Sequence, residues 1–368
     1  MYYFDYASTT KPSTQVIDLY TKLLNDVFEH PDGNNKAGKL MLEAQKMITS
    51  SLQLNSPYEV IFTSGGTEAN NLAIIGYAKN FTSSKHFITS KYEHSSADSC
   101  FKHLEALGHS VTYLNVTTDG QVDYDQLRQA ITDNTVMISI MAVNNEIGTI
   151  NCPQTIKQII KDSGRDIVYM SDAVQAVGKV NYDYNHLDII TVSGHKLYAP
   201  KAIGAVIYRK PLKLVNTIYG GAQQEGIRPG TMCPCLSAVL AYAIKNEMVN
   251  LQATIEHTQL LTEQFVTYIE NHPKAKLNVV PMASTVSVSF KTKAQSESLI
   301  TVLNNMDIYA STRSACSKKL NVPSRTLSSI GLSIHEIDRS VRFSFSRNTD
   351  VAEINYLCSK LDHILEIY

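Results

Sequence analysis

The stretch Ile189-Ile190-Thr191-Val192-Ser193-Gly194-His195-Lys196 joins an apolar run to a short polar turn. An apolar run without alternation is typical of a strand that is covered on both faces. Other β-branched runs are Val60–Thr63, His86–Thr89, Val111–Leu114, Val136–Met141, Ile167–Met170 and Ala205–Tyr208. Helical patterns such as Glu68–Lys79 and Tyr124–Ile131 lie between these runs. The alternation predicts an α/β fold with a large, mostly parallel sheet.

The pattern changes after about residue 250. Leu251–Glu270 has the pattern of one long helix, which His272-Pro273 ends. Apolar residues and serines then alternate from Val286 to Phe290, which indicates a strand with one buried face. We therefore predict a large domain over residues 14–255 and a smaller α+β domain formed by residues 1–13 and 256–368.

Composition narrows the classes of function. The chain has 368 residues, of which 43% are hydrophobic and 18% charged, so it can form more than one domain core. A formal net charge of −1 gives no general basic field for nucleic acid, which favours a small substrate. We expect a cytoplasmic protein without membrane contact, because no apolar run approaches the ~20 residues that span a bilayer and no signal-peptide pattern is present.

The cysteines predict neither a disulfide framework nor a metal site. The chain has six cysteines, which is few for its length and does not suggest a set of bridges. Cys233-Pro-Cys235 is the one tight pair, and its spacing is too short for the usual zinc knuckle.

Ligands of open α/β sheets bind at the carboxyl ends of the strands, so the residues just after each strand are candidates for chemistry. Lys196 could form an imine with an aldehyde cofactor, and Ser193 and His195 could bind the phosphate of that cofactor. Gly66 and Thr67 open a helix whose free N–H groups also favour a phosphate. The alternatives are a solvated surface lysine and a turn in which Thr67 caps the helix.

Further polar residues follow other predicted strands. Asp172 needs a cationic partner if it is buried, and a protonated pyridine nitrogen would serve. Gln175, three residues on, could donate a hydrogen bond to a ring hydroxyl from the same face of a helix that follows the strand. His94 could stack on a planar ring or move protons, and Asn145 could bind a ring oxygen or a carboxylate. The alternatives are a helix N-cap for Asp172, packing for His94 and turn chemistry for Asn145.

Two more candidates lie near the carboxyl end of the chain. Cys316 stands in a polar loop beside Arg313, Lys318 and Lys319, which favours its thiolate. Arg342 lies in an alternating run, where its guanidinium could grip an amino-acid carboxylate. Incidental exposure of the thiol and a structural ion pair of the arginine are the alternatives.

Together these segments resemble the NifS/IscS-like cysteine desulfurases of the class V aminotransferase group, which are fold type I enzymes that use pyridoxal 5′-phosphate (PLP). The match runs from Asp5-Tyr6-Ala7 to about Asn355. Its most specific pieces are Thr-Ser-Gly-Gly-Thr-Glu-Ala-Asn-Asn-Leu at 63–72, Asn-Asn-Glu-Ile-Gly at 144–148, Ser-Gly-His-Lys-Leu-Tyr-Ala-Pro-Lys at 193–201 and Ser-Ala-Cys at 314–316.

The resemblance implies a role for each candidate. The catalytic residues would be Lys196, Cys316 and His94, and the substrate carboxylate would be held by Asn145 and Arg342. PLP would be bound by Gly66, Thr67, His94, Asn145, Asp172, Gln175, Ser193, His195 and Lys196. Thr231 would reach the phosphate of a neighbouring subunit, which implies a homodimer.

The resemblance also implies the reaction. L-cysteine would become L-alanine, and a persulfide would form on Cys316 in the small domain. The loop from Cys316 to Leu332 would carry this sulfur to an acceptor protein in iron–sulfur assembly or tRNA thiolation. The alternatives are a selenocysteine lyase, a cysteine-sulfinate desulfinase, another aminotransferase of the group, or a non-catalytic scaffold for sulfur transfer.

Overall fold

The computed structural model describes residues 1–31, 33–312 and 323–367. Its largest sheet has seven strands in the order β2-β8-β7-β6-β5-β3-β4. The strands are β2 Tyr58–Thr63, β3 His86–Ser90, β4 Ser110–Leu114, β5 Thr135–Ser139, β6 Val168–Asp172, β7 Ile189–Ser193 and β8 Gly204–Arg209. Within this sheet β8 alone runs against its neighbours β2 and β7. The predicted large, mostly parallel sheet is therefore confirmed.

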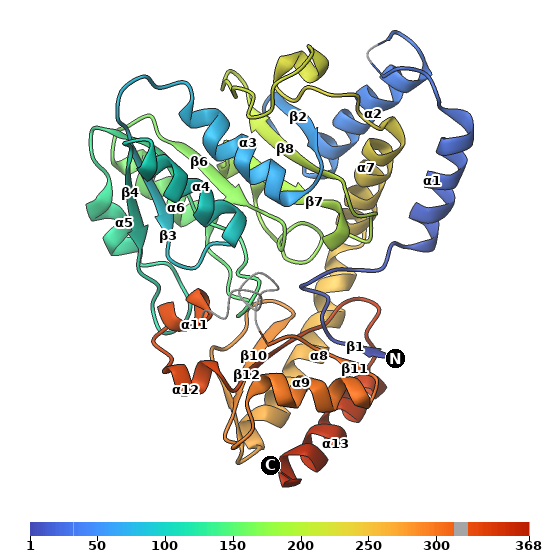
Figure 1. Cartoon of the computed structure of the whole chain (residues 1–368), viewed down its shortest axis with the longest axis vertical. Helices are drawn as coiled ribbons and strands as arrows, with labels where there is room; N and C mark the ends of the chain where they lie inside the picture. Colours follow the sequence, from blue (N-terminus) through green and yellow to red (C-terminus); the bar gives the residue numbers. More distant parts are fainter. Residues whose placement is uncertain (32, 313–322, 368) are drawn as a thin grey trace.

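Helices cover both faces of this sheet (Figure 1). Ile189 of β7 packs with α3 (Gly66–Ala78) and α4 (Ser95–Ala106), whereas Ile190 packs on the other face. Helices that contribute to this second core are α2 Lys36–Ser51, α5 Tyr124–Ala130, α6 Pro153–Asp162 and α7 Pro234–Val249. Since both faces are buried, successive strand residues are mostly apolar, which explains the apolar runs in the sequence.

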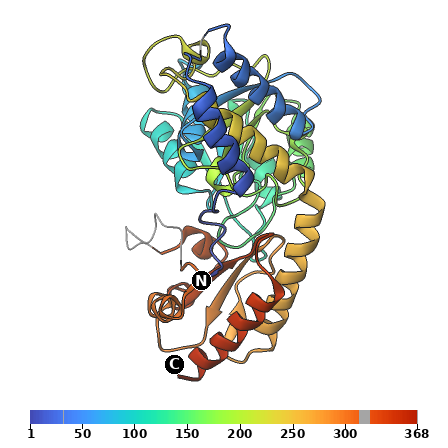
Figure 2. The same ribbon diagram turned by 90° about the vertical axis from the view of Figure 1, so that its right-hand side faces the viewer.

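A further core, separate from the two on the faces of the large sheet, forms around an antiparallel sheet of order β12-β10-β9. Its strands are β9 Ala275–Leu277, β10 Thr285–Phe290 and β12 Ser340–Ser344. The helices that contribute to it are α8 Leu251–Asn271, α9 Ser296–Asn305 and α13 Val351–Ile367, whereas α11 Arg325–Ser329 and α12 Ile334–Ile337 pack with a core of the large sheet. Helix α8 runs from the large sheet to the small one (Figure 2). The division into domains over 14–255 and over 1–13 with 256–368 stays a prediction.

The prediction that β10 has one solvent-facing side is wrong, because every residue of the strand is buried. Ser289 Oγ lies 2.8 Å from Ser340 Oγ, and Asn278 Nδ2 donates to Ser287 Oγ at 2.8 Å. Hydroxyl groups that find such partners can be buried at little cost. The serines therefore form a polar layer inside the molecule.

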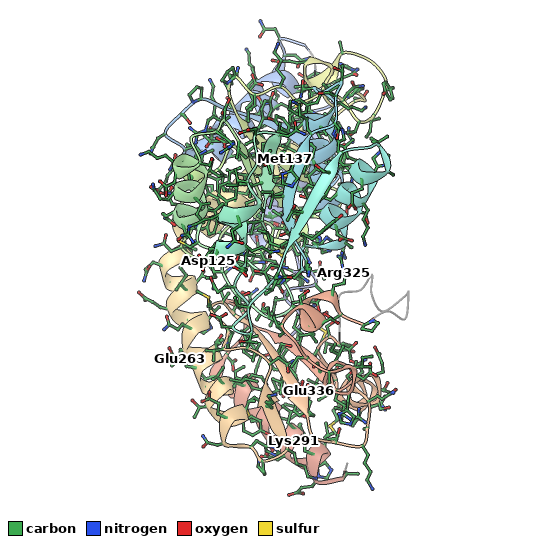
Figure 3. All side chains as sticks on the ribbon, turned by 90° about the vertical axis from the view of Figure 1, so that its left-hand side faces the viewer. Asp125, Met137, Glu263, Lys291, Arg325 and Glu336 are labelled. Atoms are coloured by element: carbon green, nitrogen blue, oxygen red, sulfur yellow. The ribbon has the colours of Figure 1, made fainter. Side chains whose placement is uncertain are left out.

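The N-terminal segment connects the two sheets. Strand β1 (Tyr2–Tyr3) pairs in parallel with β11 (Ile308–Tyr309) beside the small sheet. The chain then passes the carboxyl ends of the large sheet's strands before α1 (Thr14–Asp26) begins (Figure 1). Arg325, at the start of α11, lies at the level where the two sheets approach each other (Figure 3). No helix in the described part of the chain is long and apolar enough to cross a membrane.

Candidate active site

A cavity of about 250 Å³ lies at the carboxyl ends of the parallel strands. Its walls include Gly66 and Thr67 after β2, His94 after β3, and Asp172 and Ser193 at the ends of β6 and β7. The other residues that line it are Ala7, Ser8, Ser96, Met141, Asn145, Val174, Gln175, His195, Lys196 and Arg342. The structure thus brings together all predicted site residues that it describes, apart from Thr231.

Lys196 ends the short 3₁₀ turn Gly194–Lys196 that follows β7. Its ammonium donates hydrogen bonds to the carbonyl oxygens of Ala7 at 2.5 Å and Ser8 at 2.6 Å. Burial, and next the charge of Arg342, lower the pKa of Lys196 to about 8. An amine of this kind is uncharged in a much larger fraction near neutral pH than a surface lysine, so it can act as a nucleophile or base.

Asp172 is a buried carboxylate that forms no ion pair with the described residues. Its Oδ2 accepts a hydrogen bond from Asn70 Nδ2 at 2.8 Å, and its Oδ1 accepts one from the Val174 N–H at 3.0 Å. Both donors are neutral, so no cation among the described residues pairs directly with this carboxylate at the cavity. A buried carboxylate needs such a cation, which a bound ligand can supply.

Gln175 does not lie on the helix that was expected after Asp172, because residues 174–179 form turns. Its Nε2 donates to the Ala7 carbonyl at 2.8 Å, and its Oε1 accepts from Lys179 Nζ at 2.6 Å. The side chain still lines the cavity and keeps one amide hydrogen for a ligand. The predicted helical spacing is wrong, but both side chains lie at the same cavity.

His94 and Asp172 are connected through Asn70. The Asn70 amide donates both to Asp172 Oδ2 and to Ser96 Oγ, each at 2.8 Å, while its Oδ1 accepts from Thr191 Oγ1 at 2.7 Å. The Ser96 N–H donates to His94 Nδ1 at 3.2 Å, so the neutral ring carries its proton on Nε2. Burial lowers the pKa of His94 and favours this neutral form. Neither Asn70 nor Ser96 was expected at this site.

The phosphate candidates gather where α3 begins. Gly65 caps this helix with φ 149°, a value that favours glycine, and no side-chain cap is present in the described chain. The alternative in which Thr67 is the cap is therefore wrong. Ser193 lies beside Gly66 at this end, and His195, which also lines the cavity, has its pKa lowered to about 4 by burial and the Lys196 charge. Uncapped N–H groups, a hydroxyl and a neutral imidazole suit an anion.

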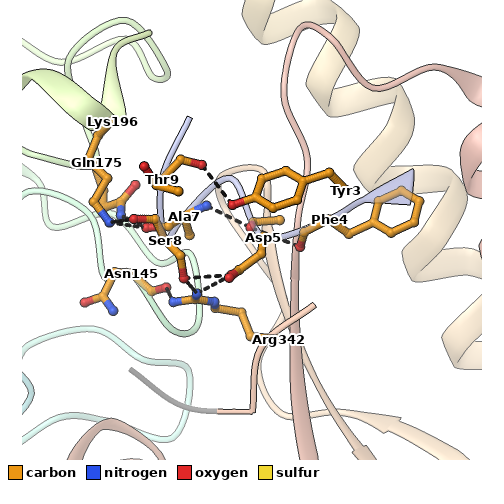
Figure 4. A network of polar contacts seen from close by, with 11 residues as sticks. Tyr3, Phe4, Asp5, Ala7, Ser8, Thr9, Asn145, Gln175, Lys196 and Arg342 are labelled. Atoms are coloured by element: carbon orange, nitrogen blue, oxygen red, sulfur yellow. Dashed lines mark hydrogen bonds and ion pairs between the residues drawn. The ribbon is translucent and has the colours of Figure 1, made fainter. Parts of the chain in front are cut away.

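Arg342 enters the cavity from β12 of the small sheet. Its Nη1 donates to the backbone oxygen of Asn145 at 2.9 Å, and its Nη2 donates to Asp5 Oδ1 at 2.6 Å and Ser8 Oγ at 2.7 Å (Figure 4). Arg342 therefore forms the structural ion pair that was considered as its alternative role. Asp5 and Ser8 were not expected here, since they lie 337 and 334 residues away in the sequence.

Two predicted residues are not placed at this cavity. Thr231 is exposed and does not line it. Cys316 lies outside the described residues, as do its neighbours Arg313, Lys318 and Lys319. The predicted loop from Cys316 to Leu332 is partly wrong, because Arg325–Ser329 forms the helix α11.

Comparisons with known proteins agree with this geometry. The family model described as "Aminotransferase class-V" matches residues 2–357. The chain is 36% identical over 379 residues to the cysteine desulfurase IscS of Dictyoglomus turgidum, covering 99% of this chain and 94% of the relative. It is 32% identical over 374 residues to a cysteine desulfurase of Nostoc sp., covering 99% and 92%.

Solved structures are similar over the same extent. One described as a NifS-like protein superposes with a TM-score of 0.92 at 26% identity and covers 100% of this chain and 99% of its own. Another, described as "SspA in complex with cysteine", has a TM-score of 0.78 at 30% identity and covers 94% and 99%.

Proposed function

The chain belongs to the class-V aminotransferase family and is a cysteine desulfurase, and we propose that it uses the residues of this cavity, with PLP and Cys316, to convert L-cysteine to L-alanine. The observation that carries the proposal is the shared position of Lys196 and Asp172. A lysine of pKa about 8 and a buried carboxylate without an ion pair among the described residues line one cavity.

The donor set fits PLP. Asp172 would accept a hydrogen bond from the protonated pyridine nitrogen, and Gln175 would donate its remaining amide hydrogen to the ring hydroxyl. The aldehyde would meet Lys196 Nζ. Gly66, Thr67, Ser193 and His195 would hold the phosphate at the start of α3. When bound, PLP supplies an electron sink for the carbanion at the substrate Cα.

The protein's own groups would then act on the amino acid. Arg342 and Asn145 would hold the substrate carboxylate, so that the Cα–H points at one acceptor. Lys196 Nζ, once free, would take this proton, since its lowered pKa leaves a larger fraction of the amine uncharged near neutral pH than an ordinary lysine has. His94 would lie against the ring with its Nε2 proton available, because Ser96 and Asn70 fix its Nδ1 side.

Cys316 would take the sulfur. Its thiolate would attack the substrate Sγ, the Cβ–Sγ bond would break, and protonation of the carbon product would give L-alanine. The described residues that precede and follow the Cys316 segment contact residues beside the cavity, which supports this role. Ser311 pairs through its backbone with Arg342, and Ser324 Oγ donates to Glu146 Oε2 at 2.5 Å, next to Asn145.

The persulfide would pass to a separate acceptor protein, an iron–sulfur scaffold or a tRNA-thiolation enzyme. Identities of 36% and 33% to relatives named cysteine desulfurase IscS support the removal of sulfur from cysteine, the step that would precede this transfer.

Incubation of the PLP-loaded protein with L-cysteine alone tests the reaction. We expect one L-alanine and one added sulfur per active site in the first turnover, with the extra mass on the Cys316 peptide in mass spectrometry. Reduction with dithiothreitol should remove this mass. Alanine formation without added sulfur on any peptide would overturn the role of Cys316, and failure to form alanine would overturn the function.

We also propose that the protein is a homodimer in which Thr231 completes the partner's phosphate site. Thr231 is exposed and absent from its own cavity, although Arg228 of the same loop is held to Glu68 of α3 by an ion pair of 2.7 Å. Nearby Tyr219 is 79% exposed and Phe28 89% exposed. Large apolar side chains of this kind favour a protein contact over solvent.

Mixed dimers of a Lys196→Ala chain and a Thr231→Ala chain distinguish the two arrangements. If Thr231 acts across the interface, both changes fall in one site and the other site is intact, so the mixture should regain one tightly bound PLP per dimer. If Thr231 acted within its own chain, each site would carry one change and no wild-type affinity would return. Equilibrium titration with PLP, followed by its absorbance, gives the affinities.

A further inference from the structure

The N-terminal segment from Asp5 to Thr9 crosses the cavity between Lys196 and Arg342 (Figure 4). Backbone oxygens of Ala7 and Ser8 accept from Lys196 on one side. The side chains of Asp5 and Ser8 accept from Arg342 on the other side. The segment therefore contacts both the reacting amine and the residue assigned to the substrate carboxylate.

The hydrogen bonds of Arg342 leave one edge of its guanidinium half occupied. Nε and Nη2 form the edge that binds both oxygens of a carboxylate. Nη2 donates to Asp5 and Ser8, whereas Nε is buried and has no partner within the described chain. Nη1 is held separately by the Asn145 backbone. Removal of Asp5 would free one of the two hydrogens of Nη2, which together with the unpartnered Nε gives two N–H donors for a carboxylate.

Resting on the function proposed above, we propose that Asp5 occupies the substrate carboxylate's place on Arg342 and must leave when the amino acid binds. In the free enzyme Asp5 neutralises a buried guanidinium, which would otherwise be costly. When a ligand binds, the two carboxylates compete for one cation. Asp5 is in this way a specificity-determining residue: a ligand must gain contacts elsewhere in the cavity to displace it.

The positions of the two side chains agree with this exchange. The Asp5 side chain is 19% exposed and the Arg342 side chain 5%, so the acid can turn toward solvent while the arginine stays. Ser8 Oγ donates to Asp5 Oδ1 at 2.8 Å and accepts from Arg342. Ser8 would keep a neutral contact with Arg342 after Asp5 has moved, so the guanidinium keeps its orientation for the substrate.

An Asp5→Asn variant separates competition from alignment. Asparagine keeps an oxygen acceptor for Arg342 and Ser8 but removes the charge. We expect KM for L-cysteine to fall about three- to tenfold, equal to about 0.6–1.4 kcal/mol, with kcat not increased. L-alanine, titrated by the absorbance change of the loaded protein, should bind tighter by the same factor, and acetate should become a stronger inhibitor.

Asp166→Asn is the matched control, because this exposed acid lies before the opposite end of β6. It should leave KM and the binding of L-alanine and acetate unchanged, and equal unfolding temperatures would show that both variants fold. A higher or unchanged KM in Asp5→Asn would overturn the proposal, since Asp5 would then align Arg342 or have no effect on it.

Arg342→Lys distinguishes this proposal from the function on which it rests. A raised KM in Arg342→Lys together with no fall in Asp5→Asn would overturn the role of Asp5 alone. An unchanged KM in Arg342→Lys would overturn the carboxylate assignment and the proposal with it. A raised KM in Arg342→Lys and a lowered KM in Asp5→Asn would support both.

Discussion

A Lys196→Ala variant should lose covalent attachment of PLP and slow alanine formation by at least about 10²–10⁴-fold, the range for one positioned acid–base group. The reason is that the same Nζ is expected to bind the cofactor and to move the Cα proton. Borohydride treatment followed by mass spectrometry should fix PLP on the Lys196 peptide of the wild type and on no peptide of the variant. Lys213→Ala, at an exposed position, is the control and should behave as wild type.

The lowered pKa of Lys196, about 8, allows a second test of the role of this residue. Only the uncharged amine can attack the aldehyde, so PLP uptake by the apoprotein should accelerate as the pH rises through about 8 and slow as it falls below. An ordinary lysine would place this midpoint near ~10.4. Stopped-flow absorbance gives the rates; a midpoint at the ordinary value, or labelling of another lysine, would contradict the assignment.

The large sheet could be predicted because burial on both faces favours apolar residues at successive strand positions. Ile189 and Ile190 face different cores, and this is visible as an unbroken run. The reversed direction of β8 could not be predicted, since a strand buried on both faces has the same pattern in either direction. The buried serines of β10 were misjudged because their partner Asn278 lies in another segment.

The site could be predicted to the extent that parallel strands end together. Lys196, Asp172 and His94 follow strands of one sheet, so their positions in the sequence imply proximity. The turn after Asp172 was predicted as a helix, but Asp172 Oδ1 binds the Val174 N–H, a local bond that competes with helix formation. Contacts between distant segments gave no signal: Asp5 meets Arg342 because the segment after β1 forms a bridge with Ser344 of β12, the strand that carries Arg342.

A Cys316→Ala variant should abolish sulfur transfer while PLP uptake stays at the wild-type level. The two properties separate because the cofactor would be held by Lys196, Asp172 and the phosphate residues, none of which is changed. With L-cysteine, the variant should still shift the absorbance of the bound cofactor, since substrate binding does not need the thiol. It should form no persulfide and no more alanine than the protein-free reaction with PLP.

The matched control is Cys152→Ala, because Cys152 is a partly exposed free thiol that does not line the cavity. It should retain full turnover and the added sulfur on the Cys316 peptide. Unchanged turnover in Cys316→Ala would contradict the persulfide mechanism and favour direct elimination from the amino acid. Loss of PLP uptake in Cys316→Ala would instead place the residue in cofactor binding. Because Lys196→Ala affects cofactor attachment and Cys316→Ala only the later sulfur transfer, the two variants together locate which half of the reaction each residue serves.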